Sequence, residues 1–97
     1  MQNIGHLIDG TLVDTTSGNT GPVYDPSTGA ETGRVALASV AEVDAAVTSA
    51  KTASEEWGQT SLARRTKLML AFRNLVVDNA DEIARRLTAE HGKVMDD

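Results

Sequence analysis

The 97-residue chain contains no cysteine. This absence excludes disulfide bonds and zinc sites built on thiolates. It also removes the thiolate, the most readily activated protein nucleophile, from any chemistry this segment could perform. A chain without cysteine fits a reducing compartment, where disulfides are rare.

Long apolar runs are also missing. No stretch approaches the roughly 20 apolar residues that a helix needs to span a bilayer. The first six residues, Met1 to His6, do not form the basic and then apolar pattern of a signal peptide. We therefore expect a cytoplasmic protein that has no membrane partner.

Aromatic and basic residues are scarce. The three aromatics are Tyr24, Trp57 and Phe72, and nine Lys and Arg stand against 14 Asp and Glu, for a net charge of −5. An acidic chain lacks the basic excess that neutralises nucleic-acid phosphates, so we expect no nucleic-acid partner. The length allows one small domain, which buries only about 60–70% of its unfolded surface and is therefore marginally stable.

The first 38 residues favour strands and turns, with strands within about residues 7–37. Asp9-Gly10 lies between two short apolar runs, which is a strong hairpin signal because Gly accepts positive φ. The segment Asp25–Gly29 predicts a turn: Pro26 presets φ, the Asp25 carboxylate can accept from amides ahead of it, and Gly29 can adopt the left-handed region. A further strand is expected at about 32–37.

The rest of the chain predicts three helices, at about 40–57, 61–78 and 80–91. Ser39 and Glu42 form a capping box at the start of the first helix, and Gly58 is expected to end it. Asn79 is expected to cap the third helix, which Gly92 ends.

Each predicted helix has an apolar face, and ion pairs are expected on the third. The i, i+4 pairs are Asp81–Arg85 and Glu82–Arg86, each contributing a few tenths of a kcal/mol. After Gly92, residues 94–97 suggest the beginning of a fourth helix. The apolar residues expected to face inward are Val43, Val47, Ala50 and Trp57 in the first helix, Leu68, Met69, Phe72, Leu75 and Val76 in the second, and Ala80, Ile83, Ala84 and Leu87 in the third.

Four features could carry chemistry, and each has a plainer interpretation. Gly18–Gly21 lacks the G-x-G-x-x-G pattern and the strand–turn–helix context of a phosphate loop. Gly92-Lys93 fits a helix end better than a P-loop. His6 and His91 have no partner at metal-ligand spacing. The basic residues in 64–67 most simply form a solvated helix face. We therefore predict no catalytic, cofactor-binding or metal-binding residue in this segment.

Several short motifs together resemble the beginning of an aldehyde dehydrogenase in both order and spacing. Within that superfamily, the Trp57–Ser61 segment before Arg64-Arg65 and the Glu90–Asp97 segment are most similar to the CoA-acylating methylmalonate-semialdehyde dehydrogenases. The motifs are Leu7-Ile8-Asp9-Gly10, Asp25-Pro26-Ser27-Thr28-Gly29, Val43-Asp44-Ala45-Ala46-Val47, Trp57 and Glu90-His91-Gly92-Lys93.

The resemblance implies an α/β fold in which N-terminal strands and three amphipathic helices form part of an NAD-binding, Rossmann-like domain. Residues 1–97 would be the N-terminal part of that cofactor domain, truncated at the C-terminus. The parent enzyme would use NAD and CoA, convert a semialdehyde to an acyl-CoA with formation of NADH, and assemble as a homo-oligomer. This segment, whose partner would be the remainder of the chain, would bind neither cofactor and be inactive alone.

Two other hypotheses stay open. The chain could be a free-standing helical interaction module without catalysis. It could also be a small nucleic-acid binder that uses the face formed by Arg64, Arg65 and Lys67.

Overall fold

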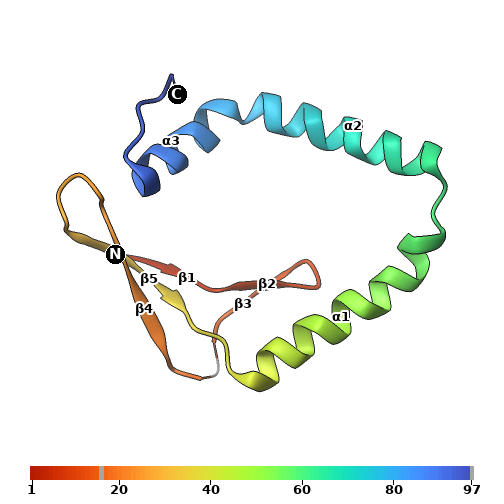
Figure 1. Cartoon of the computed structure of the whole chain (residues 1–97), viewed down its shortest axis with the longest axis horizontal. Coiled ribbons are helices and arrows are strands. Elements are labelled where there is room, and N and C mark those ends of the chain that lie inside the picture. Colours follow the sequence, from red (N-terminus) through yellow and green to blue (C-terminus); the bar gives the residue numbers. More distant parts are fainter. Residues whose placement is uncertain (16, 97) are drawn as a thin grey trace. The chain divides into compact units, whose positions relative to one another are not determined.

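The computed structural model describes residues 1–15 and 17–96, and its elements follow the mixed α/β order expected from the sequence (Figure 1). Strands come first and helices follow. The strands are β1 (Gln2–Ile4), β2 (His6–Ile8), β3 (Thr11–Val13), β4 (Thr20–Tyr24) and β5 (Glu31–Ala36), and the helices are α1 (Val40–Gln59), α2 (Leu62–Asp78) and α3 (Ala80–His91).

The chain divides into two compact units. We call the first the strand unit; it comprises Met1–Tyr24 and Ala30–Gly58 and therefore holds the strands and α1. The second, the helix unit, comprises Asp25–Gly29 and Gln59–Asp97 and holds α2 and α3 together with the turn between β4 and β5.

A three-stranded sheet in the order β1-β5-β4 forms the centre of the strand unit. Strand β1 runs parallel to β5, with Gln2 opposite Gly33, whereas β4 is antiparallel to β5. Gly33 is buried, and a Cβ built on it would lie 2.7 Å from the backbone oxygen of Gln2. Strand β1 was not expected from the sequence, because its Gln-Asn-Ile run carries one apolar residue and no alternation.

The predicted hairpin is confirmed. Strands β2 and β3 pair antiparallel with Leu7 opposite Leu12, and they form a separate two-stranded sheet. The two turn residues, Asp9 and Gly10, have φ values of 52° and 71°. Positive φ at both central positions is the requirement of a type I′ turn, whose twist matches that of the flanking strands.

Helix α1 begins where predicted, but it ends later than predicted. Gly58 was expected to stop the helix, yet α1 continues through Gly58 to Gln59. Gly58 does not adopt the positive φ of a C-terminal cap. The next helix instead restarts at Ser61, whose hydroxyl accepts a hydrogen bond from the Arg64 amide at 3.2 Å. The Ser61 cap thus marks the break between α1 and α2 more strongly than the glycine does.

Two predictions at the start of α3 are wrong: the Asn79 cap and the Asp81–Arg85 ion pair. Asn79 makes no side-chain cap for α3; its Nδ2 donates to the Leu75 carbonyl at 2.8 Å, so the side chain closes α2 instead. Arg85 pairs with Glu82 at 3.1 Å rather than with Asp81, while the Glu82–Arg86 pair is confirmed at 2.9 Å. One carboxylate therefore serves both arginines.

Gly92 ends α3 as predicted. Its φ is 83°, and its amide donates to the Thr88 carbonyl at 2.8 Å. The following residues do not begin a fourth helix: as far as Asp96 they are irregular or form a turn, and Asp97 lies outside the described residues.

The apolar faces of the helices were expected to point inward, but they are exposed. Val47 is 61% exposed, Phe72 58% and Leu87 51%, and among the described residues no hydrophobic side chain is buried. The elements are too few and their side chains too small for them to cover one another. In the described part of the chain, none of the helices has the length and apolar character that crossing a membrane requires.

Candidate functional site

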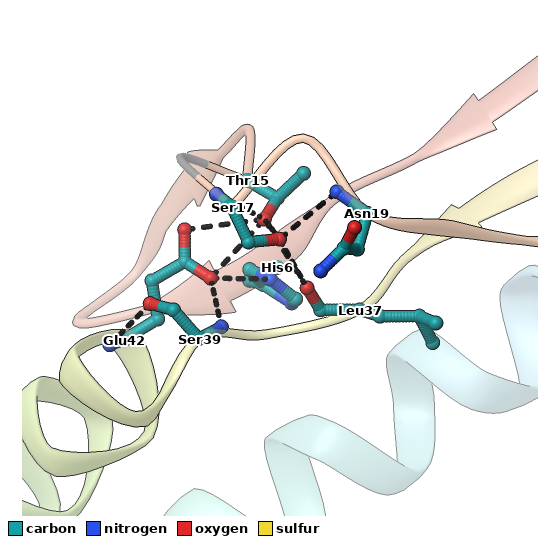
Figure 2. A network of polar contacts seen from close by, with 7 residues as sticks. All are labelled: His6, Thr15, Ser17, Asn19, Leu37, Ser39 and Glu42. Carbon is teal, nitrogen blue, oxygen red and sulfur yellow. Dashed lines mark hydrogen bonds and ion pairs between the residues drawn. The ribbon is translucent and has the colours of Figure 1, made fainter.

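A network of polar contacts surrounds the first turn of α1 in the strand unit (Figure 2). We call it the Glu42 cluster. Its side chains come from β2, from the loop before β4 and from the start of α1, and they meet the backbone that follows β5. The members are His6, Thr15, Ser17, Asn19, Leu37, Ser39 and Glu42.

The capping box builds the base of the cluster. The Glu42 amide donates to the Ser39 hydroxyl at 3.1 Å, and the Ser39 amide donates to Glu42 Oε2 at 2.8 Å. Two amides at the helix start are thereby satisfied reciprocally, as the sequence predicts. The geometry also fixes the Glu42 carboxylate above the helix N-terminus, where the helix dipole favours a negative charge.

Glu42 also reaches across to the strands. The Thr15 hydroxyl lies 3.3 Å from Oε1 and 3.2 Å from Oε2, and His6 Nε2 lies 3.6 Å from Oε2. The side chains of His6 and Glu42 are 18% and 10% exposed. A carboxylate this enclosed needs donors to offset its desolvation. Thr15 supplies one from 27 residues away, and His6, 36 residues away, lies within ion-pair distance.

Ser17 ties the preceding loop to the end of β5. Its hydroxyl donates to the Leu37 carbonyl at 2.7 Å and accepts from the Asn19 amide at 3.1 Å. The Leu37 amide in turn donates to the Asn19 carbonyl at 2.9 Å. Hydrogen bonds therefore join this loop to the end of β5, and Thr15 joins it to the start of α1.

The cluster holds an imidazole, a carboxylate and hydroxyls, but their geometry does not suit nucleophilic catalysis. A catalytic hydroxyl must be within hydrogen-bond reach of its base. Here the Thr15 and Ser17 hydroxyls contact Glu42, Leu37 and each other, and among the described residues His6 Nε2 is buried without a hydrogen-bond partner. The arrangement suits a structural role, in which strand β2 and the loop are held against the helix.

The other features considered in the sequence do not join this cluster. His6 lies in the strand unit, whereas His91 lies in the last turn of α3 in the helix unit. Within residues 1–15 and 17–96, no group of three or more His, Cys, Asp or Glu side chains is placed to hold a metal ion. Gly18 leads into strand β4 rather than into a helix, so the loop lacks the setting of a phosphate-binding turn.

The basic residues near the start of α2 are likewise dispersed. Arg64 and Lys67 are exposed, and Arg65 Nε donates to the Thr60 carbonyl at 3.1 Å. The Arg65 side chain thus binds the backbone before its own helix. The exposure of Arg64 and Lys67 agrees with the solvated helix face expected from the sequence, whereas Arg65 is half-buried.

A second polar motif, in the helix unit, is the turn at Asp25–Gly29. The Ser27 hydroxyl and amide both donate to Asp25 Oδ1, at 2.6 and 2.8 Å. The hydroxyl of Ser27 contributes most to lowering the pKa of the Asp25 carboxyl, followed by the Ser27 amide and then by Thr28. Gly29 adopts a φ of 74° and donates to the Asp25 carbonyl, so the predicted turn is confirmed.

Sequence reasoning identified Glu42 only as half of a capping box and missed its contacts with His6 and Thr15. A capping-box motif shows that the carboxylate lies at a helix start, but it does not show which distant segment uses the remaining lone pairs. The only available signal was the polar Thr and Ser residues in the loop before β4. The prediction that the segment holds no catalytic or cofactor-binding residue stays a prediction.

A sequence model of the aldehyde dehydrogenase family matches residues 12–97. Malonate-semialdehyde dehydrogenase 3 of Geobacillus kaustophilus is 38% identical over 99% of this chain and 20% of its own length. The mitochondrial acylating methylmalonate-semialdehyde/malonate-semialdehyde dehydrogenase of Mus musculus is 39% identical over 94% of this chain and 17% of its own.

A solved structure agrees with these sequences. A Sinorhizobium meliloti 1021 protein, assigned as a methylmalonate-semialdehyde dehydrogenase and crystallised with NAD, superposes with a TM-score of 0.94 at 45% identity. The superposition covers 99% of this chain and 20% of that protein. The chain thus spans about a fifth of the length of the relatives it matches, and it belongs to the aldehyde dehydrogenase family.

Proposed function

We propose that residues 1–97 form the N-terminal part of the cofactor domain of an NAD-dependent dehydrogenase acting on malonate semialdehyde or methylmalonate semialdehyde. The overall reaction would convert the semialdehyde, CoA and NAD to an acyl-CoA and NADH. The names of the two relatives and of the solved structure support this substrate class and this cofactor. We also propose a cytoplasmic homo-oligomer as the complete enzyme.

The observation that carries the proposal is the combination of a close structural match with exposed apolar helix faces. The chain superposes on an aldehyde dehydrogenase at a TM-score of 0.94, yet it represents 20% of that protein. At the same time, Leu68, Phe72 and Leu75 on α2 are 48–61% exposed. Exposed apolar surface of this extent marks an interface, and the remaining four-fifths of a dehydrogenase would be the surface that covers it.

The role of the segment within that enzyme would be structural. The chain contains no cysteine. In the strand unit, His6 Nε2 makes no hydrogen bond with the nearby hydroxyls of Thr15 and Ser17. The described glycines offer no phosphate loop ahead of a helix. We therefore expect the isolated chain to oxidise no semialdehyde and to bind neither NAD nor CoA.

Fragment complementation tests this proposal. The 97-residue chain is mixed with a Geobacillus kaustophilus malonate-semialdehyde dehydrogenase 3 from which the matching N-terminal fifth has been deleted. NADH formation is followed with malonate semialdehyde and with methylmalonate semialdehyde, each with and without CoA. Activity that requires both fragments and CoA supports the proposal. Activity that requires both fragments but not CoA would support a dehydrogenase segment and contradict the acylating reaction.

The controls in this experiment are each fragment alone, and the chain with the substitution Phe72→Asp on its exposed face. We expect the charged side chain to abolish complementation, because it would be buried unpaired against the partner fragment. Turnover by the 97-residue chain alone, surviving repurification, would contradict a purely structural role. A soluble mixture in which the two fragments neither bind nor become active would contradict the proposed scaffold function.

The state of the isolated chain provides an independent test. Because its helix faces are uncovered, we expect strong far-ultraviolet helical signal, weak near-ultraviolet signal at Trp57, binding of the dye ANS and a broad thermal transition. A monomer with a sharp melt would instead favour the free-standing interaction module.

A further inference from the structure

The turn of the β2–β3 hairpin contains the one position in the chain where Asp or Asn is followed by Gly, at Asp9-Gly10. The main-chain nitrogen after an aspartate can attack the side-chain carboxyl carbon and close a five-membered ring. A side chain on the attacking residue hinders this approach, and glycine has none. The sequence therefore puts the least hindered combination at this turn.

The structure leaves the same two residues open. Asp9 and Gly10 are both exposed, and a Cβ built on Gly10 would meet nothing within 4 Å. No hydrogen bond of the Gly10 amide is present among the described residues. The attacking nitrogen is therefore neither shielded by neighbours nor held by a partner.

The turn end of the hairpin is weakly supported, in contrast to the other end, where His6 lies against Glu42. The hairpin is a separate two-stranded sheet, and its facing pair Leu7 and Leu12 is 70% and 82% exposed. An isolated two-stranded hairpin is marginally stable in water, and segments with few buried contacts open at low free-energy cost. The rotation that brings the Gly10 nitrogen onto the Asp9 side chain disrupts the turn, but here that disruption meets little resistance.

Water also has access to the site. Asp9 lines an open hollow of about 580 Å³ whose other walls are small side chains of α1, including Ala45, Ser49 and Ala53. Both the release of water and its later addition can therefore take place without rearrangement of the helix.

We propose that Asp9-Gly10 is a site of spontaneous backbone modification, at which a cyclic succinimide forms and opens to an isoaspartyl linkage. The Gly10 nitrogen bonds to the Asp9 Cγ and loses its proton, and the carboxyl Cγ–O bond breaks with release of water. Water then adds to one of the two ring carbonyls. Addition at Cγ restores aspartate, whereas addition at the main-chain carbonyl leaves the chain running through the side chain.

The product would change the hairpin. An isoaspartyl linkage inserts an additional methylene into the main chain of a two-residue turn. That insertion is incompatible with the close pairing of Ile8 with Thr11 directly across the turn. The modification would therefore weaken β2–β3 while leaving the mass and the side-chain composition of the chain unchanged.

The chain supplies its own internal controls. Trypsin releases residues 1–34 as one peptide, because Arg34 is the first basic cleavage site. That peptide also contains Asp14, which is followed by a threonine, and Asp25, which is followed by a proline and so has no attacking N–H. Three aspartates in one fragment thus differ in the residue that follows them.

The test incubates the folded chain at neutral pH and body temperature in heavy-oxygen water, followed by trypsin and fragmentation mass spectrometry. Each cycle of ring opening incorporates one heavy oxygen, so label is expected at Asp9, at a rate about tenfold or more above Asp14; tenfold corresponds to about 1.4 kcal/mol of activation free energy. Chromatography should resolve a second form of the 1–34 peptide. In the intact modified chain, the amide hydrogens of β2 and β3 should exchange with solvent faster than in the original chain.

Two variants keep the proposal falsifiable. Asp9→Glu should abolish label and second form whether or not the hairpin folds, because the longer side chain would have to close a less favourable six-membered ring. Asp9→Asn should lose ammonia at this position as the ring closes, and ring opening by water should leave an acid in place of the amide. Label at Asp9 no faster than at Asp14, or a second form that persists in Asp9→Glu, would overturn the assignment.

Discussion

The strand unit and the helix unit hold their elements together in different ways. In the strand unit, an enclosed carboxylate on α1 joins segments that are far apart in the sequence, such as β2 and the loop at Thr15. In the helix unit, the ion pairs are local, as between Glu82 and Arg86, and lie on an exposed surface. The strand unit is held by a few enclosed polar contacts, whereas the helix unit depends on helix propensity, caps and local ion pairs and has an exposed apolar face.

The difference shows where single substitutions should matter. Removing an enclosed carboxylate deprives its hydrogen-bond donors of their acceptor. Exposed ion pairs contribute between about zero and 1 kcal/mol. The two units should therefore respond unequally to changes that look alike in the sequence.

The largest effect is expected for Glu42→Ala. The substitution removes the capping box, worth about 1 kcal/mol. It leaves the Ser39 amide without its acceptor and removes the contacts of the Thr15 hydroxyl with the carboxylate. We expect a loss of about 2–3 kcal/mol in the free energy of opening for α1 and β2, measured by amide hydrogen exchange. The matched control is Glu55→Ala, an exposed glutamate on the same helix. Equal effects of the two substitutions would show that the Glu42 cluster does not fasten the strand unit.

Gly33→Ala tests the parallel pairing of β1 with β5. A Cβ at this position would lie 2.7 Å from the Gln2 backbone oxygen, and backbone cannot move aside as a flexible side chain can. We expect a loss of about 2 kcal/mol, because overpacking typically costs 1–3 kcal/mol. Gly21→Ala is the control: it lies opposite Val35 in the same sheet, and its Cβ would meet side chains at 3.7 and 3.8 Å. Exchange protection in β1 that survives Gly33→Ala would contradict the pairing.

The sequence allowed local features to be predicted better than distant ones. The Asp9-Gly10 turn and the Ser39–Glu42 box were predicted because the residues that make them are within three positions of each other. Strand β1 was not, because its pairing depends on Gly33, about 30 residues away, and on nothing visible in its own three residues. For the same reason the role of Glu42 as an acceptor for Thr15 could not be read from its position.

Two errors arose where competing local signals were close together. Gly58 was expected to end α1, but it lacks the positive φ of a left-handed cap, and the break occurs at the Ser61 cap downstream instead. Asn79 was expected to cap α3, but the same side chain can also donate backward to the Leu75 carbonyl. One residue between two helices can serve either one, and its sequence alone does not decide which.

Gly92→Ala and Gly58→Ala should change stability in opposite directions: the first should destabilise the end of α3, and the second should stabilise α1. Gly92 holds a φ of 83°, where an L side chain costs about 1–2 kcal/mol, and its Cβ would also lie 3.3 Å from Pro26 Cγ. Gly58 is helical and has open space around it, so alanine there should raise helix stability by about 0.5–1 kcal/mol. Thermal unfolding followed by circular dichroism measures both. Destabilisation by Gly58→Ala would restore the view that this glycine terminates α1.

The smallest effect is expected from the pH dependence of the turn at Asp25–Gly29. Hydrogen bonds from Ser27, its hydroxyl first, lower the pKa of the Asp25 carboxyl below its ordinary value of 3.8. A carboxylate with a lowered folded-state pKa contributes stability that is present above the unfolded value and is lost as the pH falls through the folded value. The turn should therefore be unaffected by pH above about 4 and loosen only in stronger acid. Because the carboxylate is only partly shielded from solvent, screening keeps this contribution small. An NMR titration of the Asp25 side chain measures the pKa.

Ser27→Ala should raise the pKa of Asp25 toward the ordinary value, and Asp25→Asn should remove the acid-dependent change in the Ser27 and Gly29 amide signals. A Ser27→Ala titration that matches the original would show that the hydroxyl does not stabilise the charged form.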